Sequence, residues 1–275
     1  MKSIFSRYKY LFLVHLACTW NLTGAPDRES FAKEKRDIQG VPVEAFDLGN
    51  QDLQIELWAR SPLIFSPVAM DFDAKGRLWL TEGIDYNQRP RVDAGRSIIM
   101  LEDKNGDGKA DSSKVFVTEK EIRHAPLGIA VFDNRIVLSA TPSIIVYTDV
   151  NRNAVFEPKI DKREIFLTGF KNKNHDHTVH AVVGAPSGQW HFSFGNCGAD
   201  LRTKDGRHFL SGCYYGYPEA IGKPSSDGEV YVGGMTMRIN PDGTGLRSTG
   251  ENMHNPHDMF VTSQGDVLQS DNDDP

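Results

Sequence analysis

One pattern of hydrophobic and polar positions repeats along the chain after about residue 50. A short apolar strand is followed by a turn with Gly or Asn, and then by a second apolar strand that often carries an aromatic residue. Four such pairs are predicted: 68–72 with 77–81, 127–131 with 135–138, 181–183 with 189–192, and 259–261 with 266–269. Further strands at 97–102, 114–118, 144–147 and 162–167 complete the first two units.

The spacing of the repeats favours blades of a β-propeller. The turn residues Gly76, Asn134, Gly188 and Gly265 lie 58, 54 and 77 residues apart, somewhat more than the roughly 40 to 50 residues of a minimal four-stranded blade. No stretch keeps a helical period over three turns. The sequence therefore predicts an all-β, six-bladed type of propeller that is incomplete, with about four blades present. A β-sandwich is the alternative.

Both ends of the repeat region bear on closure of the ring. Leu53–Trp58 is predicted as a strand that would complete a final blade, yet no final blade follows, and 269–275 ends just after a strand. An open propeller exposes sheet edges, so we expect a fragment or truncated product. The predicted domains are a signal peptide at 1–25, an extended lead-in at 26–47 and the partial propeller at 48–275.

The first 25 residues have the layout of a secretory signal. Lys2, Arg7 and Lys9 precede an apolar run over 10–20, and small residues follow. That run is too short to span a bilayer. We expect an exported protein, periplasmic or extracellular; a lipoprotein anchored at Cys18 is the weaker alternative. Loss of this segment changes the formal charge from −6 to −9, which argues against nucleic acid as a partner.

Two cysteines remain after residue 25. Cys197 and Cys213 enclose 15 residues, and a disulfide between them would stabilise the fold by about 3 kcal/mol in the chain-entropy model. An exported protein permits this bridge. The alternative is a pair of free buried thiols.

An aspartate-rich loop is a candidate calcium site. Asp103, Asn105, Asp107 and Asp111 occupy loop positions 1, 3, 5 and 9, with glycine at position 6, and Ca²⁺ prefers such oxygen ligands. Position 12 is a lysine, and the flanks are predicted strands. A turn rich in Asp and Asn without metal is the alternative. A weaker copy follows at 149–157.

Histidines gather just before the third repeat. His175, Asp176, His177 and His180 lie within six residues, where the start of an inner propeller strand would face the axial cavity. A histidine beside a carboxylate can act as a general base, because the carboxylate fixes its tautomer. A transition-metal site or solvated loop residues are alternatives. In an extended strand His177 and His180 would face opposite sides.

Two further segments extend the candidate site. His254 and Asn255 occupy the matching position before the fourth repeat, although an ordinary Asn-Pro turn is the alternative. An insertion over 199–235, rich in Gly, Tyr and Pro, is longer than a blade hairpin requires. Such a loop can cover a binding face.

These motifs resemble a known family. Asp176-His177, followed by the segments 183–188 and 190–196, resembles the third blade of soluble PQQ-dependent glucose and sorbosone dehydrogenases. Residues 50–275 are more similar still to the membrane-bound dehydrogenase propellers of Planctomycetes and Verrucomicrobia, which share the segments 100–103 and 270–274.

The resemblance implies a quinoprotein-type dehydrogenase acting on a sugar or alcohol. His177 would take the hydroxyl proton, with Asp176 beside it, while hydride passes to PQQ. Asn255 would face the cofactor, His254 stands where the family has arginine, and Ca²⁺ and a cytochrome-type electron acceptor would be partners. The later blades with their cofactor-clamping basic residues, and a cytochrome c module, are absent from this sequence.

Two other functions are compatible with the same residues. A non-catalytic extracellular propeller that binds carbohydrate or a protein partner would explain His254 at the arginine position. A lactonase-like propeller would hold an axial metal, for which only Asp176 and Asp258 are candidate carboxylates.

Overall fold

The computed structural model describes residues 45–49, 52–83, 95–122, 125–171 and 176–272. The predicted signal peptide, nearly all of the lead-in and His175 lie outside these residues. Within them the regular secondary structure is almost entirely β-strand, as predicted, with one short 3₁₀ helix, η2.

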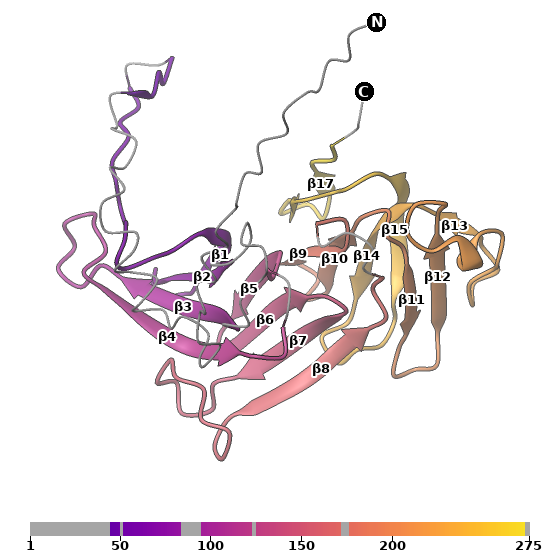
Figure 1. Ribbon diagram of the computed structural model, residues 1–275, viewed down its shortest axis with the longest axis horizontal. Coiled ribbons are helices and arrows are strands. Elements are labelled where there is room, and N and C mark those ends of the chain that lie inside the picture. The colour runs from indigo at the N-terminus through magenta and orange to yellow at the C-terminus, as the bar shows by residue number, and fades with distance from the viewer. Residues whose placement is uncertain (1–44, 50–51, 84–94, 123–124, 172–175, 273–275) are drawn as a thin grey trace, which may run out of the picture.

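The first two blades are four-stranded antiparallel sheets whose strands follow one another in sequence (Figure 1). The first consists of β1 (Pro67–Phe72), β2 (Leu78–Glu82), β3 (Arg96–Glu102) and β4 (Ser112–Glu119). The second consists of β5 (Gly128–Phe132), β6 (Arg135–Ala140), β7 (Ser143–Thr148) and β8 (Lys162–Thr168). Their middle strands are buried along nearly their whole length. The second blade packs between the first and the third, and the free face of the first is covered by the segment before β1, which includes Trp58, Leu63 and Ile64.

The third blade contains the insertion. Its sheet is built from β9 (Val179–Gly184), β10 (Trp190–Phe194), β14 (Gly234–Ile239) and β15 (Arg247–Met253). Between β10 and β14, the strands β11 (Ala199–Arg202), β12 (His208–Gly212) and β13 (Tyr231–Val232), with η2 (Pro218–Ala220), form a separate three-stranded sheet. The hairpin of β16 (Met259–Val261) and β17 (Val267–Gln269) follows.

The first strands of successive blades surround a common cavity. β1 contacts β5, β5 contacts β9, and β9 contacts β16. Residues of β1, β5 and β9, together with His257 and Asp258, line a cavity of about 760 Å³. This arrangement of antiparallel blades around an axial space is that of a β-propeller. The number of blades in a closed ring stays a prediction.

Aromatic residues fill the spaces between blades. Between the first two blades, Phe116 packs edge-on against Trp79 and Tyr147. Its ring centroid lies 5.4 Å from that of Trp79 and 5.8 Å from that of Tyr147. Phe132 of the second blade stacks on Trp190 of the third at 5.1 Å. Since burying one such side chain contributes about 1.5 to 3 kcal/mol, these contacts fix the angle between neighbouring blades.

One predicted strand is wrong. Leu53–Trp58 forms no strand; one of its backbone hydrogen bonds runs from the Ala110 amide to the Trp58 carbonyl oxygen, 2.9 Å away. An apolar alternating segment becomes a strand only where a partner supplies a hydrogen-bonded ladder. In the described part of the chain, no helix is long and apolar enough to cross a membrane.

Candidate functional site

His177 precedes β9, and its ring is hydrogen-bonded to a side chain that follows β10. Its Nδ1 lies 2.8 Å from Oδ1 of Asn196. An amide oxygen can only accept a hydrogen bond, so Nδ1 of His177 donates it, and Nε2 has a lone pair when the ring is neutral. A neutral imidazole in this tautomer is competent to remove a proton.

Two other rings lie against His177. The His254 ring meets it edge-on with centroids 4.7 Å apart, and the Tyr215 ring is tilted against it at 5.6 Å. His254 comes from the segment before β16, and Tyr215 comes from the insertion. Three segments distant in sequence therefore meet at this histidine.

An aspartate near the end of the described chain positions His254 and Asn255. Asp271 accepts hydrogen bonds from the backbone amides of both residues, at 3.1 and 2.7 Å. Nδ1 of His254 donates to the carbonyl oxygen of Asn272 at 2.8 Å. These two residues of the segment 270–274, which the sequence shares with the resembling family, thus anchor the turn before β16.

Asn255 faces a second histidine. Its Oδ1 accepts a hydrogen bond from Nε2 of His180 at 2.8 Å, and both residues are buried. Burial, with a further contribution from the neighbouring His257, lowers the pKa of His180 to about 4. The His180 and His257 rings lie 4.9 Å apart. His177, in the turn before β9, and His180, in the strand, thus have different ring partners.

Gly195 permits the close approach of these elements. A Cβ atom here would lie 2.7 Å from Oδ1 of Asn255 and 2.9 Å from Cα of His177. Real side chains keep larger separations. A glycine between Phe194 and Asn196 therefore lets β10 bring both candidate residues together.

Asp176 does not make the contact expected of it. Its Oδ1 is buried without a hydrogen-bond partner among the described residues, and the group bonded to His177 is Asn196. No signal in the sequence singled out Asn196, although it closes the motif over 190–196 on which the resemblance rests. Asp176 and His177 both lie in the turn before β9, whereas Asn196 lies across the hairpin, where it faces His177.

The predicted disulfide is not formed. Cys197 and Cys213 are both thiols, and Sγ of Cys213 donates to the carbonyl oxygen of Asn196 at 2.8 Å. This hydrogen bond directs the Cys213 sulfur to the backbone of the residue before Cys197. The structure therefore has the alternative to the disulfide, in which both cysteines are thiols.

The aspartate-rich loop folds around its own backbone. Asp103 accepts hydrogen bonds from the amides of Gly106 and Gly108 at 2.7 and 2.9 Å. Desolvation opposes the charged form, but backbone hydrogen bonds from Gly108 and Gly106 lower the pKa of Asp103. Asp111 accepts from the amide of Lys104 at 2.7 Å. The loop is thus closed by hydrogen bonds from its own backbone to its aspartates.

The other two predicted ligands close the same turn. Nδ2 of Asn105 lies 3.2 Å from Asp107 and from Asp111. Across the described ranges, no cluster of three or more His, Cys, Asp or Glu side chains is arranged to hold a metal ion. Calcium binding by this loop stays a prediction.

Comparison with known proteins places the chain in a family. The model of a family described as "Domain of unknown function (DUF7133)" matches residues 46–275. The chain belongs to this family. No curated protein matches the chain.

Three solved structures show similarity at low identity. The holo form of the pyranose dehydrogenase PQQ domain from Coprinopsis cinerea is 14% identical with a TM-score of 0.47, over 75% of this chain and 43% of that one. The calcium structure of Trichoderma reesei carbohydrate-active enzyme family AA12 is 16% identical (TM-score 0.32, 48% and 30%). Virginiamycin B lyase from Staphylococcus aureus, as the selenomethionine form, is 13% identical (0.34, 76% and 71%). The chain spans less than half of the first two, and no activity follows from any of them.

The donor set at His177 bears on the predicted cofactor. PQQ carries three carboxylates and needs cationic partners. The rings and amide that contact His177 belong to Asn196, Tyr215 and His254, none of which has a permanent positive charge. A quinone at this site would therefore need cationic partners other than these three residues.

Proposed function

We propose that the chain belongs to a propeller enzyme of the quinoprotein dehydrogenase type, in which His177 removes the proton of a sugar or alcohol hydroxyl. The hydrogen bond between Nδ1 of His177 and Asn196 carries this proposal. It fixes the tautomer whose Nε2 accepts a proton, and the resulting positive charge on the ring is stabilised by the Asn196 oxygen.

The neighbouring rings have positioning roles in this proposal. Nδ1 of His254 donates to a backbone carbonyl, which fixes the orientation of its ring beside the base. Tyr215 contributes an aromatic face beside the base. Asn255 is directed to His180 and supports the turn that carries His254.

Dye-linked oxidation tests this function. Purified full-length chain would be assayed with PQQ, Ca²⁺ and a series of aldoses and alcohols, alongside His177→Asn. We expect turnover by the wild type and a loss of at least about 100-fold in the variant, the usual contribution of a general base. Absence of wild-type turnover with every substrate would contradict the proposal.

A second candidate is a non-catalytic propeller that binds carbohydrate. The observation in its favour is the uncharged set of groups at His177, with His254 where the resemblance expects arginine. Fluorescence titration with PQQ separates the two candidates. Tight quinone binding would exclude the second, and carbohydrate binding without quinone binding would support it.

Export belongs to the same proposal. A sugar-oxidising protein outside the cytoplasm would carry the secretory signal that 1–25 resembles. Mass determination of the mature N-terminus after expression with a secretion system tests it. Cleavage near residue 25 is the expected result, and a retained leader contradicts it.

A further inference from the structure

The loop over 213–217 carries an exposed aromatic ring next to the candidate base. Tyr214 is 88% exposed, more than any other large hydrophobic side chain in the described residues. The next residue, Tyr215, is 38% exposed and lies against the His177 ring. The residue that precedes Tyr215 in the chain thus offers a largely exposed aromatic ring.

Glycines fix this loop to the β10–β11 corner. A Cβ on Gly216 would lie 2.3 Å from Cα of Cys197, and one on Gly198 would lie 2.4 Å from the carbonyl oxygen of Ser211. The amide of Tyr217 donates to the Cys213 carbonyl oxygen at 3.2 Å. Backbone packs on backbone here, so the loop cannot take a side chain at these positions without moving.

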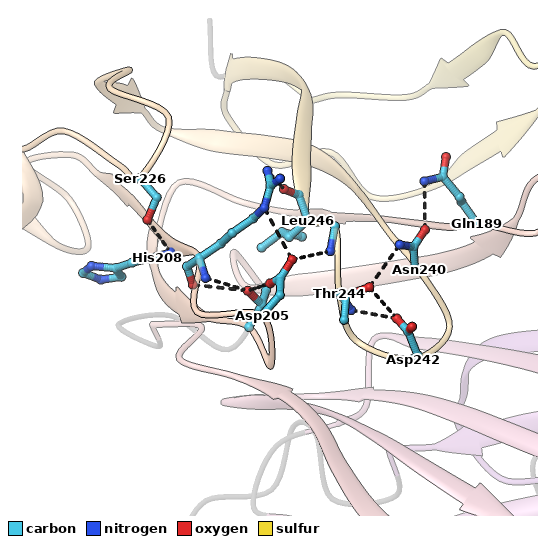
Figure 2. Close-up of polar contacts among 11 residues, drawn as sticks. Gln189, Asp205, His208, Ser226, Asn240, Asp242, Thr244 and Leu246 are labelled. Atoms are coloured by element: carbon cyan, nitrogen blue, oxygen red, sulfur yellow. Dashed lines mark hydrogen bonds and ion pairs between the residues drawn. The ribbon is translucent and has the colours of Figure 1, made fainter.

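The far end of the insertion is anchored as well. Asp205, in the β11–β12 turn, accepts a hydrogen bond from the Gly245 amide in the β14–β15 turn at 2.9 Å, within the network of polar contacts drawn in Figure 2. Asn240 of that second turn accepts from Gln189 at 3.1 Å. The backbone of the insertion is thus tied to its blade at the β11–β12 turn as well as at the β10–β11 corner.

A sugar ring suits this arrangement. One face of a pyranose presents C–H groups that pack on an aromatic ring, while its hydroxyls need polar partners. Tyrosine offers a large rigid face with a hydroxyl at its tip and loses little conformational entropy on binding. Imidazoles and Asn196 beside Tyr215 supply hydrogen-bonding groups.

We propose that Tyr215 and Tyr214 form two consecutive carbohydrate subsites, Tyr215 for the sugar unit at His177 and Tyr214 for the next unit of an oligosaccharide. This inference rests on the proposed function for the identity of the reacting unit. It adds that the ligand is longer than a monosaccharide. A disaccharide covers both rings, whereas a monosaccharide covers only one.

Calorimetric titration of the full chain without quinone tests the subsites. The ligands are glucose and gluco-oligosaccharides of increasing length with α-1,4 or β-1,4 linkages. We expect at least one disaccharide to bind about tenfold more tightly than glucose, the ratio that one added stacking contact provides. Tyr214→Ala should remove this ratio while leaving glucose affinity unchanged, and Tyr214→Trp should preserve it.

A matched control removes an exposed ring from another blade. Phe260 is 54% exposed on β16, and Phe260→Ala should keep the full ratio. Equal affinity for glucose and every oligosaccharide, no binding at all, or an unchanged ratio in Tyr214→Ala would overturn the inference. So would a Tyr214→Ala effect confined to electron transfer to an added cytochrome, which would assign the ring to a protein partner.

The two proposals can fail separately. Because binding is measured without quinone, oligosaccharide selectivity without any oxidation would keep the subsites and reject the dehydrogenase function. Oxidation whose KM is the same for glucose and oligosaccharides, in the wild type and in Tyr214→Ala, would keep the dehydrogenase function and reject the subsites.

Discussion

Replacement of Gly216 by alanine tests how firmly the tyrosine loop is fixed. The new Cβ would lie 2.3, 2.4 and 2.6 Å from the Cα, O and C atoms of Cys197. Carbon atoms in contact normally lie 3.5 to 4.0 Å apart, so one backbone segment must move by about 1 Å. Neither segment has a flexible side chain to absorb the shift, which places the cost near the upper end for overpacking, at about 3 kcal/mol.

A second glycine separates this steric cost from backbone strain. Gly76 has φ of +75°, and no atom lies within 4 Å of the position that an added Cβ would take. Gly76→Ala therefore carries only the cost of a left-handed backbone, about 1 to 2 kcal/mol. Gly216→Ala carries the clash, and it should be the more destabilising of the two.

Urea unfolding of both variants and the wild type gives the comparison. We expect Gly216→Ala to lower the midpoint more than Gly76→Ala without a change in slope. About 3 kcal/mol corresponds to a fall in Tm of roughly 6 to 12 °C in a domain of this size. If Gly216→Ala costs no more than Gly76→Ala, the loop is not clamped on Cys197 and the preformed tyrosine subsites lose their basis.

The remaining predictions concern protonation, a buried network and calcium. The pKa of His180 is lowered from 6.5 to about 4, so the unfolded chain binds a proton at this residue more readily than the folded chain does. The free energy of unfolding is therefore highest above pH 6.5 and falls by roughly 3 kcal/mol as the pH drops toward 4. The difference between the urea midpoints at pH 7 and pH 5 should therefore be smaller in His180→Gln than in the wild type. An equal difference in the two proteins would show that burial of His180 does not cause the pH dependence. The buried Tyr147 hydroxyl donates to Glu119, and Tyr147→Phe should cost about 1 to 3 kcal/mol in chemical denaturation because the carboxylate loses a partner; a neutral substitution would refute this. If the aspartate-rich loop binds Ca²⁺, millimolar calcium should raise the wild-type Tm and leave Asp103→Asn unchanged, whereas equal responses of the two proteins would place any calcium effect elsewhere.

The strand pairs of the blades were predictable because each has an unambiguous local signal. The pair at 127–131 and 135–138 is continuously apolar around an Asn turn, and it corresponds to β5 and β6. The sheet of β11–β13 was not predicted. Its short strands lie among Gly, Tyr and Pro, where turn signals outweigh the strand pattern.

The site was predictable as a set of segments and not as a set of contacts. Histidines at matching positions before two blades do meet, since His177 contacts His254. The orienting residue is Asn196, because hydrogen bonding across a hairpin depends on register rather than on sequence adjacency. The thiol of Cys213 likewise bonds the Asn196 carbonyl, a pairing that cysteine spacing does not reveal.

Chemical rescue of a His177 variant tests the central claim most directly. In the dye-linked assay, His177→Ala removes the group whose Nδ1 is held by Asn196 and leaves a space that a small base can enter. The account predicts that the variant loses at least about 100-fold in rate and that added imidazole restores part of it in proportion to the neutral imidazole concentration. A variant that turns over at the wild-type rate would show that His177 is not the base.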